Sequence, residues 1–329
     1  MRAVVIVDAS DRSISLAVGV LRAGGLVAMP TETVYGLAAD ASDPQAVSRV
    51  FAAKGRPLGH PLIVHIGAGA SLADWTRHVS DDALRLADAF WPGPLTLVLQ
   101  RHPSVPTVVT GGRETVAVRM PAHPVAQRLL ESFGGGLAAP SANRFGRVSP
   151  TTASDVRADL GDLVELIIDG GPCEIGVEST IVDIAGGEET RRATILRPGG
   201  VSPEALAEVL GRPLQTTVSA TARAPGMLAS HYAPRTRLTL CGEDEAPRRV
   251  AELVATGARV GVLSLRGVEA PGARVAWDAG GDVILLARSL YRWLRQADHE
   301  ALDALVVVPP PAEGLGIAVR DRLRRAAHR

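Results

Sequence analysis

Short apolar runs bounded by glycine, proline or polar residues recur through residues 1–211. Runs of this length with flanking turn residues are typical of β-strands. The sequence therefore predicts a sheet built from the segments GLVAM, PLIVHI, LTLVLQ, TVAVRM, GLAA, VELIID, STIVDI and ATILR.

The segment SDPQAVSRVFAAKG, between the first two runs, has the periodicity of a helix instead. Ser42 or Asp43 can cap its start and Gly55 can end it, because these residue types suit the free backbone groups at helix ends. Lys54 then lies at the helix C-terminus, and Arg56 lies on the loop beyond it. The predicted buried stripe of this helix is Ala46, Val47, Val50 and Phe51.

The pattern changes after residue 211. Residues 212–236 are polar, contain prolines and show no clear periodicity, which predicts a linker. Apolar runs and helical segments then alternate again, in the order RLTLC, a helix near 246–256, RVGVLSL, a helix near 283–296, ALVVVPP and GIAVRDRLRRA. We therefore predict an α/β protein with a first domain at 1–211, a linker at 212–236, and a small Rossmann-like, three-layer domain with a largely parallel sheet at 237–329.

Composition narrows the class of protein. A chain of 329 residues, 46% of them apolar, is long enough for two domains with buried cores. The 35 basic and 35 acidic residues balance, which argues against a protein that mainly coats nucleic acid or an anionic membrane. No run reaches the roughly 18 apolar residues of a membrane span, and Cys173 and Cys241 form no CxxC pair. We expect a soluble protein of the reducing cytoplasm, without a disulfide framework or a zinc site.

Two residue types occur once each. One lysine, Lys54, stands beside 34 arginines, and the one asparagine is Asn143. Such a composition looks like the product of a coding bias, under which a surviving lysine or asparagine marks a chemical need. Chance is the alternative, because a rare residue must still lie somewhere. The compact, rotatable charge of lysine follows phosphate oxygens more readily than the rigid fork of arginine, which favours a phosphate-binding role for Lys54.

Polar residues collect where the apolar runs end. They are Thr31, Glu32, Thr33 and Tyr35 after VAMP, Ser141 and Asn143 after GLAAP, and Arg197 and Pro198 after ATIL. Ligands of open α/β sheets bind at strand ends. The pattern therefore predicts one polar cleft.

The basic residues of this cleft point to an anion. Lys54, Arg56 and Arg197 could share it, and crowding like charges is costly unless an anion is present. A polyphosphate is the natural candidate, although the chain has neither GxxxxGKS/T nor GxGxxG, so a nucleotide would bind on another scaffold. Arg119, on one face of TVAVRMP, either extends to solvent or holds a carboxylate with its planar fork. His65, in PLIVHI, is either a hydrogen-bonded core residue or part of the cleft.

Nine short motifs occur in register along nearly the whole chain. Seven lie in the first domain: PTETVYGL (30–37), KGRP (54–57), HPLIVH (60–65), VAVRMP (116–121), APSAN (139–143), VESTIVD (177–183) and ILRPG (195–199). Two follow, APGMLASHYAP (224–234) and GLGIAVRDRLRRAA (314–327). In order, these motifs resemble those of the YrdC-type threonylcarbamoyl-AMP synthases, and the last two resemble the linker and C-terminal domain of the longer, two-domain members.

The resemblance implies a fold, a reaction and partners. The first domain would be a YrdC-like twisted mixed sheet flanked by helices. L-threonine, bicarbonate or CO2, and ATP would give threonylcarbamoyl-AMP and pyrophosphate, with Mg2+ accompanying the ATP. The product would serve a tRNA threonylcarbamoyl transferase complex that modifies an adenosine next to the anticodon. Stable binding of nucleic acid or of a membrane by this chain is not expected.

Matching motif positions imply the site residues. Threonine would be bound by Thr33, His65, Arg119, Ala139 and Ser179, with Arg119 on its carboxylate. ATP would be bound by Lys54, Arg56, His60, Thr115, Ser141, Asn143, Ser149, Arg197 and Tyr232, of which Lys54 and Arg56 would also be catalytic and Tyr232, on the linker, would close over the nucleotide. The metal ligands stay unknown. His60 stands where the family usually has asparagine, and an imidazole can still hydrogen-bond phosphate.

Two other functions stay open at this point. An RNA-binding module would use the same cations on phosphate, but the neutral net charge and the four Phe, four Trp and three Tyr argue against it. A carbamoyl transferase with a ready-made carbamoyl donor would need no threonine to turn over ATP. No Ser-His-Asp or Cys-His pattern indicates a protein nucleophile.

Overall fold

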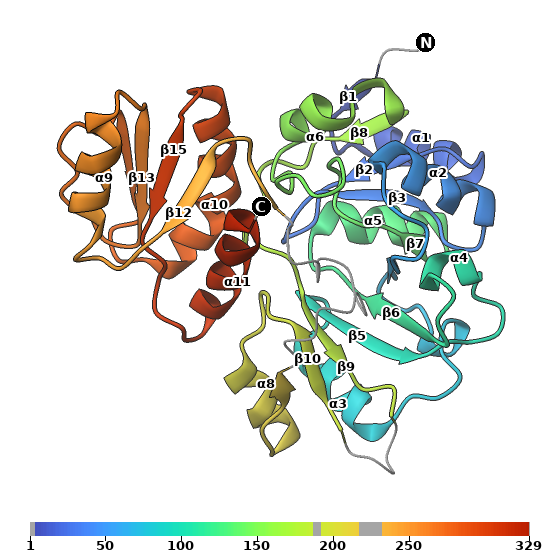
Figure 1. Ribbon diagram of the computed structural model, residues 1–329. Helices are drawn as coiled ribbons and strands as arrows, with labels where there is room; N and C mark the ends of the chain where they lie inside the picture. Colours follow the sequence, from blue (N-terminus) through green and yellow to red (C-terminus); the bar gives the residue numbers. More distant parts are fainter. Residues whose placement is uncertain (1–3, 187–191, 217–231, 329) are drawn as a thin grey trace.

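Two sheets organise the protein (Figure 1). The computed structural model describes residues 4–186, 192–216 and 232–328. The first sheet is mixed and has eleven strands in the order β1-β8-β2-β3-β7-β4-β6-β5-β9-β10-β11, and the second has four in the order β12-β15-β13-β14. The predicted α/β class is confirmed.

The first sheet takes its strands from the chain before residue 217. They are β1 (Val5–Val7), β2 (Val27–Met29), β3 (Gly36–Asp40), β4 (Ile63–His65), β5 (Leu95–Gln100), β6 (Thr115–Arg119), β7 (Leu137–Ala138), β8 (Leu166–Ile168), β9 (Thr180–Asp183), β10 (Thr194–Arg197) and β11 (Gln215–Thr216). The helices of this unit are α1 (Asp11–Arg22), α2 (Pro44–Lys54), α3 (Asp81–Phe90), α4 (Thr107–Thr110), α5 (Pro124–Phe133), α6 (Ala153–Leu160) and α8 (Pro203–Leu210), with short 3-10 turns η1 (Leu72–Asp74) and η2 (Gly161–Leu163).

Each of the eight apolar runs predicted for this unit contains a strand. The prediction missed β1 and β3. The first is a three-residue edge strand. The second has the sequence GLAAD, whose first four letters are the same as those of the run that was predicted and forms β7. β11 lies inside the predicted linker and pairs with β10, and residues 217–231 of that linker lie outside the described residues. The division into 1–211, 212–236 and 237–329 stays a prediction.

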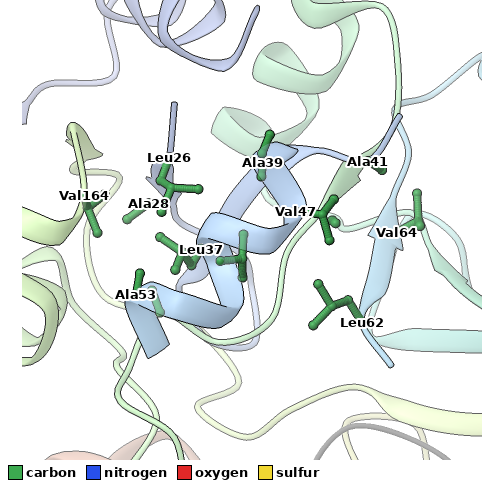
Figure 2. Close-up of a cluster of buried hydrophobic side chains, with 14 of the residues drawn as sticks. Leu26, Ala28, Leu37, Ala39, Ala41, Val47, Ala53, Leu62, Val64 and Val164 are labelled. Carbon is green, nitrogen blue, oxygen red and sulfur yellow. The ribbon is translucent and has the colours of Figure 1, made fainter. Parts of the chain in front are cut away.

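Helix α2 begins and ends as its sequence predicts. The Asp43 carboxylate accepts a hydrogen bond from the Gln45 N–H, and Gly55 adopts the left-handed conformation, φ 63°, that favours glycine at a helix end. The predicted stripe Ala46, Val47, Val50 and Phe51 is buried. Figure 2 shows α2 residues packed against Leu37 of β3, Val64 of β4 and Leu62, which directly precedes β4. The close packing fixes the helix end that carries Lys54.

The second unit is a parallel sheet with helices on both faces. Its strands are β12 (Arg237–Leu240), β13 (Val260–Ser264), β14 (Val275–Asp278) and β15 (Ala304–Val307), and all their pairings are parallel. Its helices are α9 (Ala246–Ala255), α10 (Val283–His299) and α11 (Leu315–Ala327). Figure 1 shows α9 on the far side of this sheet and α10 and α11 on the side of the first unit.

The two units share a hydrophobic core. Val34, Val148 and Val177 of the first unit belong to the same buried cluster as Leu290 of α10 and Val319 of α11. Burial of apolar surface between the units holds them together. Within the described ranges, every helix is too short or too polar to cross a bilayer.

Candidate active site

One cavity of about 40 Å3 collects most of the predicted site residues. Strands β4 and β6 are parallel, with His65 paired to Arg119, so both side chains reach the same edge of the sheet. The predicted residues that line the cavity are Thr33, Arg56, His65, Arg119, Ala139, Ser141, Ser179, Arg197 and Tyr232. The predicted Lys54, His60, Thr115, Asn143 and Ser149 are not among its lining residues. The roles of both sets stay predictions.

Arg119 is held in one orientation. Its Nη2 donates to Glu32 Oε1 at 2.6 Å and its Nε donates to the Gly93 carbonyl at 3.2 Å. The other oxygen of Glu32 accepts from the Ala122 N–H at 3.1 Å. Both side chains of the ion pair are about 5% exposed, so neither extends to solvent. Glu32 therefore fixes the direction in which the remaining N–H groups of the Arg119 guanidinium point.

His65 is neutral at physiological pH. Burial, with the nearby charge of Arg119, lowers the pKa of His65 from 6.5 to about 3. A buried, neutral imidazole beside a buried guanidinium offers a hydrogen-bonding nitrogen without adding a second positive charge. It suits a small polar ligand whose own carboxylate occupies Arg119.

A second arginine of the cavity, Arg197, is fixed at the end of β10. The register between β9 and β10 shifts between Ile195 and Arg197, and such bulges re-aim a side chain. Arg197 Nη2 donates to the Ser179 carbonyl at 2.9 Å and to Ser179 Oγ at 3.0 Å. Ser179 Oγ also shares a hydrogen bond with Thr96 at 2.8 Å. Arg197 and Ser179 are therefore hydrogen-bonded to each other, and both line the cavity.

Comparison with known proteins places this arrangement in a family. A family model described as "Telomere recombination" (Sua5_yciO_yrdC) matches residues 19–199, and one described as "Threonylcarbamoyl-AMP synthase, C-terminal domain" matches residues 201–328. The chain belongs to the two-domain threonylcarbamoyl-AMP synthases. The predicted family resemblance is confirmed, and the family is one of ATP-using nucleotidyltransferases.

The relatives match over almost their whole length. Threonylcarbamoyl-AMP synthase of Pyrococcus abyssi is 43% identical over 325 residues, which cover 95% of this chain and 94% of that protein. The Bacillus subtilis enzyme of the same name is 39% identical over 331 residues, covering 97% and 94%. The crystal structure of P. abyssi Sua5 complexed with L-threonine has a TM-score of 0.91 and 40% identity, and covers 98% of this chain and 97% of that one.

Lys54 of this synthase holds a loop. Its Nζ donates to the carbonyl oxygens of Ser141 and Asn143, the latter at 2.6 Å. The side chain is buried, and burial, together with the charge of Arg56, puts the pKa of Lys54 well below its ordinary value. The side chain of the single lysine thus donates a hydrogen bond to the backbone carbonyl of the single asparagine. Lys54 thereby fixes the loop that brings Ser141 to the cavity.

Three buried polar atoms of the predicted site residues Arg56, His65 and Asn143 have no hydrogen-bond partner among the described residues. They are Arg56 Nε, His65 Nδ1 and Asn143 Oδ1. Arg56 Nη2 donates to the Pro61 carbonyl at 2.9 Å, and Asn143 Nδ2 donates to the carbonyls of Arg144 and Arg147. Buried polar groups are nearly always satisfied. Unpaired polar atoms on three predicted site residues fit a polar ligand.

Of the remaining predicted residues, His60 lies near Arg56 and Thr115 lies at the other end of β6. His60 packs edge-on against Phe145 at 5.4 Å, and the Arg56 guanidinium lies 5.7 Å from the same ring centroid. Burial, followed by the charges of Arg56 and Arg113, lowers the pKa of His60. Thr115 begins β6, at the opposite end of that strand from Arg119.

Sequence reasoning assigned no role to four buried polar residues of the site. Glu32 and Glu178 lie inside the motifs PTETVYGL and VESTIVD, and Arg322 lies inside GLGIAVRDRLRRAA, so the motifs were the available signal. Tyr291, in α10, lies in none of the nine motifs, so the sequence offered no signal for it. Glu178 lines the cavity and accepts a hydrogen bond from Ser149 Oγ at 2.7 Å.

Proposed function

We propose that the protein makes threonylcarbamoyl-AMP from L-threonine, bicarbonate or CO2, and ATP, and releases pyrophosphate. The observation that supports this most is the Glu32-oriented Arg119 in one cavity with neutral His65 and with the basic side chains Arg56 and Arg197. One oriented arginine suits a carboxylate, and two further arginines suit phosphates.

Threonine would bind through its carboxylate to Arg119. Thr33, His65 and Ser179 would hydrogen-bond its polar groups, and Ala139, whose N–H donates to the Ile63 carbonyl, would border it. Its free amine would add to CO2 to give a carbamate. Holding both reactants in place lowers the barrier, because the entropy of bringing them together is lost on binding and not in the reaction step.

The carbamate oxygen would attack the α-phosphorus of ATP in line, and pyrophosphate would leave. This step needs positioning and charge stabilisation and no protein nucleophile. Arg56 and Arg197 would stabilise the phosphates, and Lys54 would act by holding the Ser141–Asn143 loop. Burial lowers the pKa of Arg56 to about 10, which still leaves the side chain charged at neutral pH.

Magnesium would arrive with ATP. Among the described residues, no group of three or more His, Cys, Asp and Glu side chains could hold a metal ion, and Glu32 and Glu178 already pair with arginines. Mg2+ commonly keeps several waters and binds through substrate phosphates. Mg2+ would therefore be held by the substrate phosphates, as MgATP.

Tyr232 would move to admit ATP. The cavity of about 40 Å3 is far below the roughly 300–1,000 Å3 of an ordinary small-molecule site, and Tyr232 is one of its walls. Once ATP is bound, the same ring would close over it and keep water from the mixed anhydride. The product would pass to a tRNA threonylcarbamoyl transferase complex in the cytoplasm, without stable binding of nucleic acid by this chain.

The test is pyrophosphate release from ATP by purified protein, with and without L-threonine and bicarbonate. We expect release only when both are present. Release that is indifferent to threonine would favour a carbamoyl transferase with another donor. No release, together with salt-dependent binding of RNA, would favour an RNA-binding module.

A further inference from the structure

Glu178 is a buried carboxylate at which the two units of the protein meet. It accepts hydrogen bonds from Ser149 Oγ at 2.7 Å, from the Tyr291 hydroxyl at 2.8 Å and from Arg322 Nε at 2.6 Å. Ser149 belongs to the first unit, Tyr291 to α10 and Arg322 to α11. Because Glu178 also lines the cavity, these two helices of the second unit bond directly to the wall of the candidate active site.

The same two side chains hold Tyr232. The Arg322 guanidinium lies 5.2 Å from the centroid of the Tyr232 ring, and the Tyr291 ring stacks on Tyr232 at 5.8 Å with 25° between the planes. Tyr232 has a φ of 62°, a left-handed conformation that is strained for a residue with a large side chain. Contacts from the second unit therefore stabilise a conformation that Tyr232 would not favour alone.

Packing alone does not account for an arginine at this position. Arg322 is completely buried, and a buried ion pair is often no more stabilising than apolar residues of the same volume. Its Nη1 donates to Asp321 at 2.7 Å, whereas its Nη2 has no partner within the described ranges. The presence of an arginine at position 322 is therefore better explained by its contacts with Glu178 and Tyr232 than by a contribution to folding stability.

We propose that Arg322 is a positioning residue for synthesis, which acts from the second unit by holding the Glu178 carboxylate and, with Tyr291, by stabilising the closed position of Tyr232 to which the ring returns once ATP is bound. Through Glu178 it also positions Ser149. This inference rests on the proposed function and adds to it that the C-terminal unit supplies part of the active site.

Electrostatics provide a way to observe the role. The charged and titratable groups that face Glu178 are Arg322, Arg197, Tyr291 and Tyr232. Burial acts to raise the pKa of Glu178, but Arg322 and then Arg197 outweigh it and hold the pKa at about 2. Without Arg322, burial is opposed only by Arg197 and by the hydrogen bond from Ser149, and the pKa of Glu178 rises. A variant without Arg322 should therefore lose activity as the pH falls.

The experiment compares Arg322→Gln with Arg322→Lys and with the matched control Arg324→Gln, an exposed arginine of the same helix. Threonine-dependent pyrophosphate release gives kcat and KM from about pH 6 to about pH 9. We expect kcat/KM of Arg322→Gln to fall about 100-fold at neutral pH and to recover as the pH rises. Arg322→Lys should restore part of the loss, and Arg324→Gln should match the parent.

The two proposals fail in different ways. A parent protein without threonine-dependent turnover would contradict the proposed function. A parent that turns over, beside a folded Arg322→Gln variant with the same kinetics and pH profile, would contradict the role of Arg322. A loss of kcat/KM that matches the unfolded fraction in thermal melts and is equal at every pH would also contradict it.

If Arg322→Gln does not fold, Tyr291→Phe provides a second test, because it keeps the ring and removes the hydroxyl that donates to Glu178. Its kcat/KM should fall less than expected for Arg322→Gln and with the same pH dependence. Kinetics of Tyr291→Phe equal to those of the parent would overturn the proposal.

Discussion

Single residues of the site are held by partners that lie far away in the sequence. Lys54 binds the Ser141 and Asn143 carbonyls, Glu32 orients Arg119, and the nearest of these partners is 87 residues away from the side chain it holds. Composition indicates a chemical need for Lys54 and Asn143, and the properties of lysine favour a phosphate-binding role for Lys54. The structure gives Lys54 a further role that composition could not reveal, because the two carbonyls that accept from it are brought there by the fold.

Replacement of Lys54 should affect both folding and turnover. Lys54→Met leaves the buried Asn143 carbonyl and the part-buried Ser141 carbonyl without this donor, and an unsatisfied buried group costs about 1–3 kcal/mol. Lys54→Arg puts a larger, planar group in the same buried space and should also lower turnover. Chemical denaturation and pyrophosphate release measure the two effects. If both variants match the parent in stability and rate, Lys54 has no special role.

Arg119→Lys should weaken threonine recognition. Lysine keeps the charge beside Glu32 but loses the planar fork, and a charge-assisted hydrogen bond contributes about 1.5–3 kcal/mol. The threonine KM should rise roughly ten- to one-hundred-fold. The control is Arg128→Lys, at an exposed ion pair with Asp11. An unchanged threonine KM would contradict the assignment of Arg119.

Neutral His65 should make folding stability depend on pH. Its pKa is lowered from 6.5 to about 3 in the folded protein, so between these values the unfolded chain binds the extra proton. Stability should therefore rise with pH across that window, and should fall by about 1.4 kcal/mol for each unit that the pH drops below 6.5. Urea denaturation at pH 7 and at about pH 5 should show a smaller difference for His65→Gln than for the parent. Equal differences would count against this explanation.

At the level of elements, the termini and faces of the helices and strands position the site. Parallel β4 and β6 bring His65 and Arg119 to one edge, and α10 lays one face on the first unit. On that face Arg288 donates to the Glu174 carbonyl, Tyr291 to Glu178 and Arg295 to Asp159. The spacing of these three residues places them on one side of a helix. From the sequence alone, this polar side of α10 would be expected to face solvent. The periodicity therefore predicted the helix but not its interface with the first unit.

The close approach of two chain segments beside Ser179 depends on a glycine. A Cβ on Gly199 would lie 2.3 Å from backbone atoms of the Glu178–Thr180 segment. Gly199→Ala should displace that segment and lower turnover by about 100-fold if the shift approaches 1 Å. The matched control is Gly19→Ala, inside α1 with open space around it, which should stabilise the protein by about 0.5–1 kcal/mol. Parent-like turnover of Gly199→Ala would show that the segment can adjust.

The whole molecule acts as one body because a hydrophobic cluster crosses between its units. Val34, Val148 and Val177 pack with α10 and α11 residues, and Arg295 donates to the Val148 carbonyl at 2.6 Å. We expect parent protein to unfold in one calorimetric transition, since neither unit buries this surface alone.

Gly176 provides the test of this coupling. It has a φ of 79°, and a Cβ there would lie 2.5 Å from the Arg288 Cα of α10. Gly171 has a φ of 83° and open space, so Gly171→Ala carries the backbone strain without the collision. Gly176→Ala should destabilise the protein by about 1–3 kcal/mol more than Gly171→Ala and separate the calorimetric transition into two. Equal effects of the two substitutions would mean that the units are not tightly coupled.

The sequence by itself determined the local features: the strand runs, the caps and stripe of α2, the parallel α/β pattern after residue 236, and the motifs that identify the family. These follow from neighbours in the chain, where periodicity, capping and turn chemistry act. The tertiary structure alone decided that Glu32 orients Arg119, that Lys54 supports a loop, and that Arg322 and Tyr291 reach Glu178 from the other unit. Those contacts join residues 87 to 144 positions apart, and a buried charge takes whichever partner the packed core brings within reach.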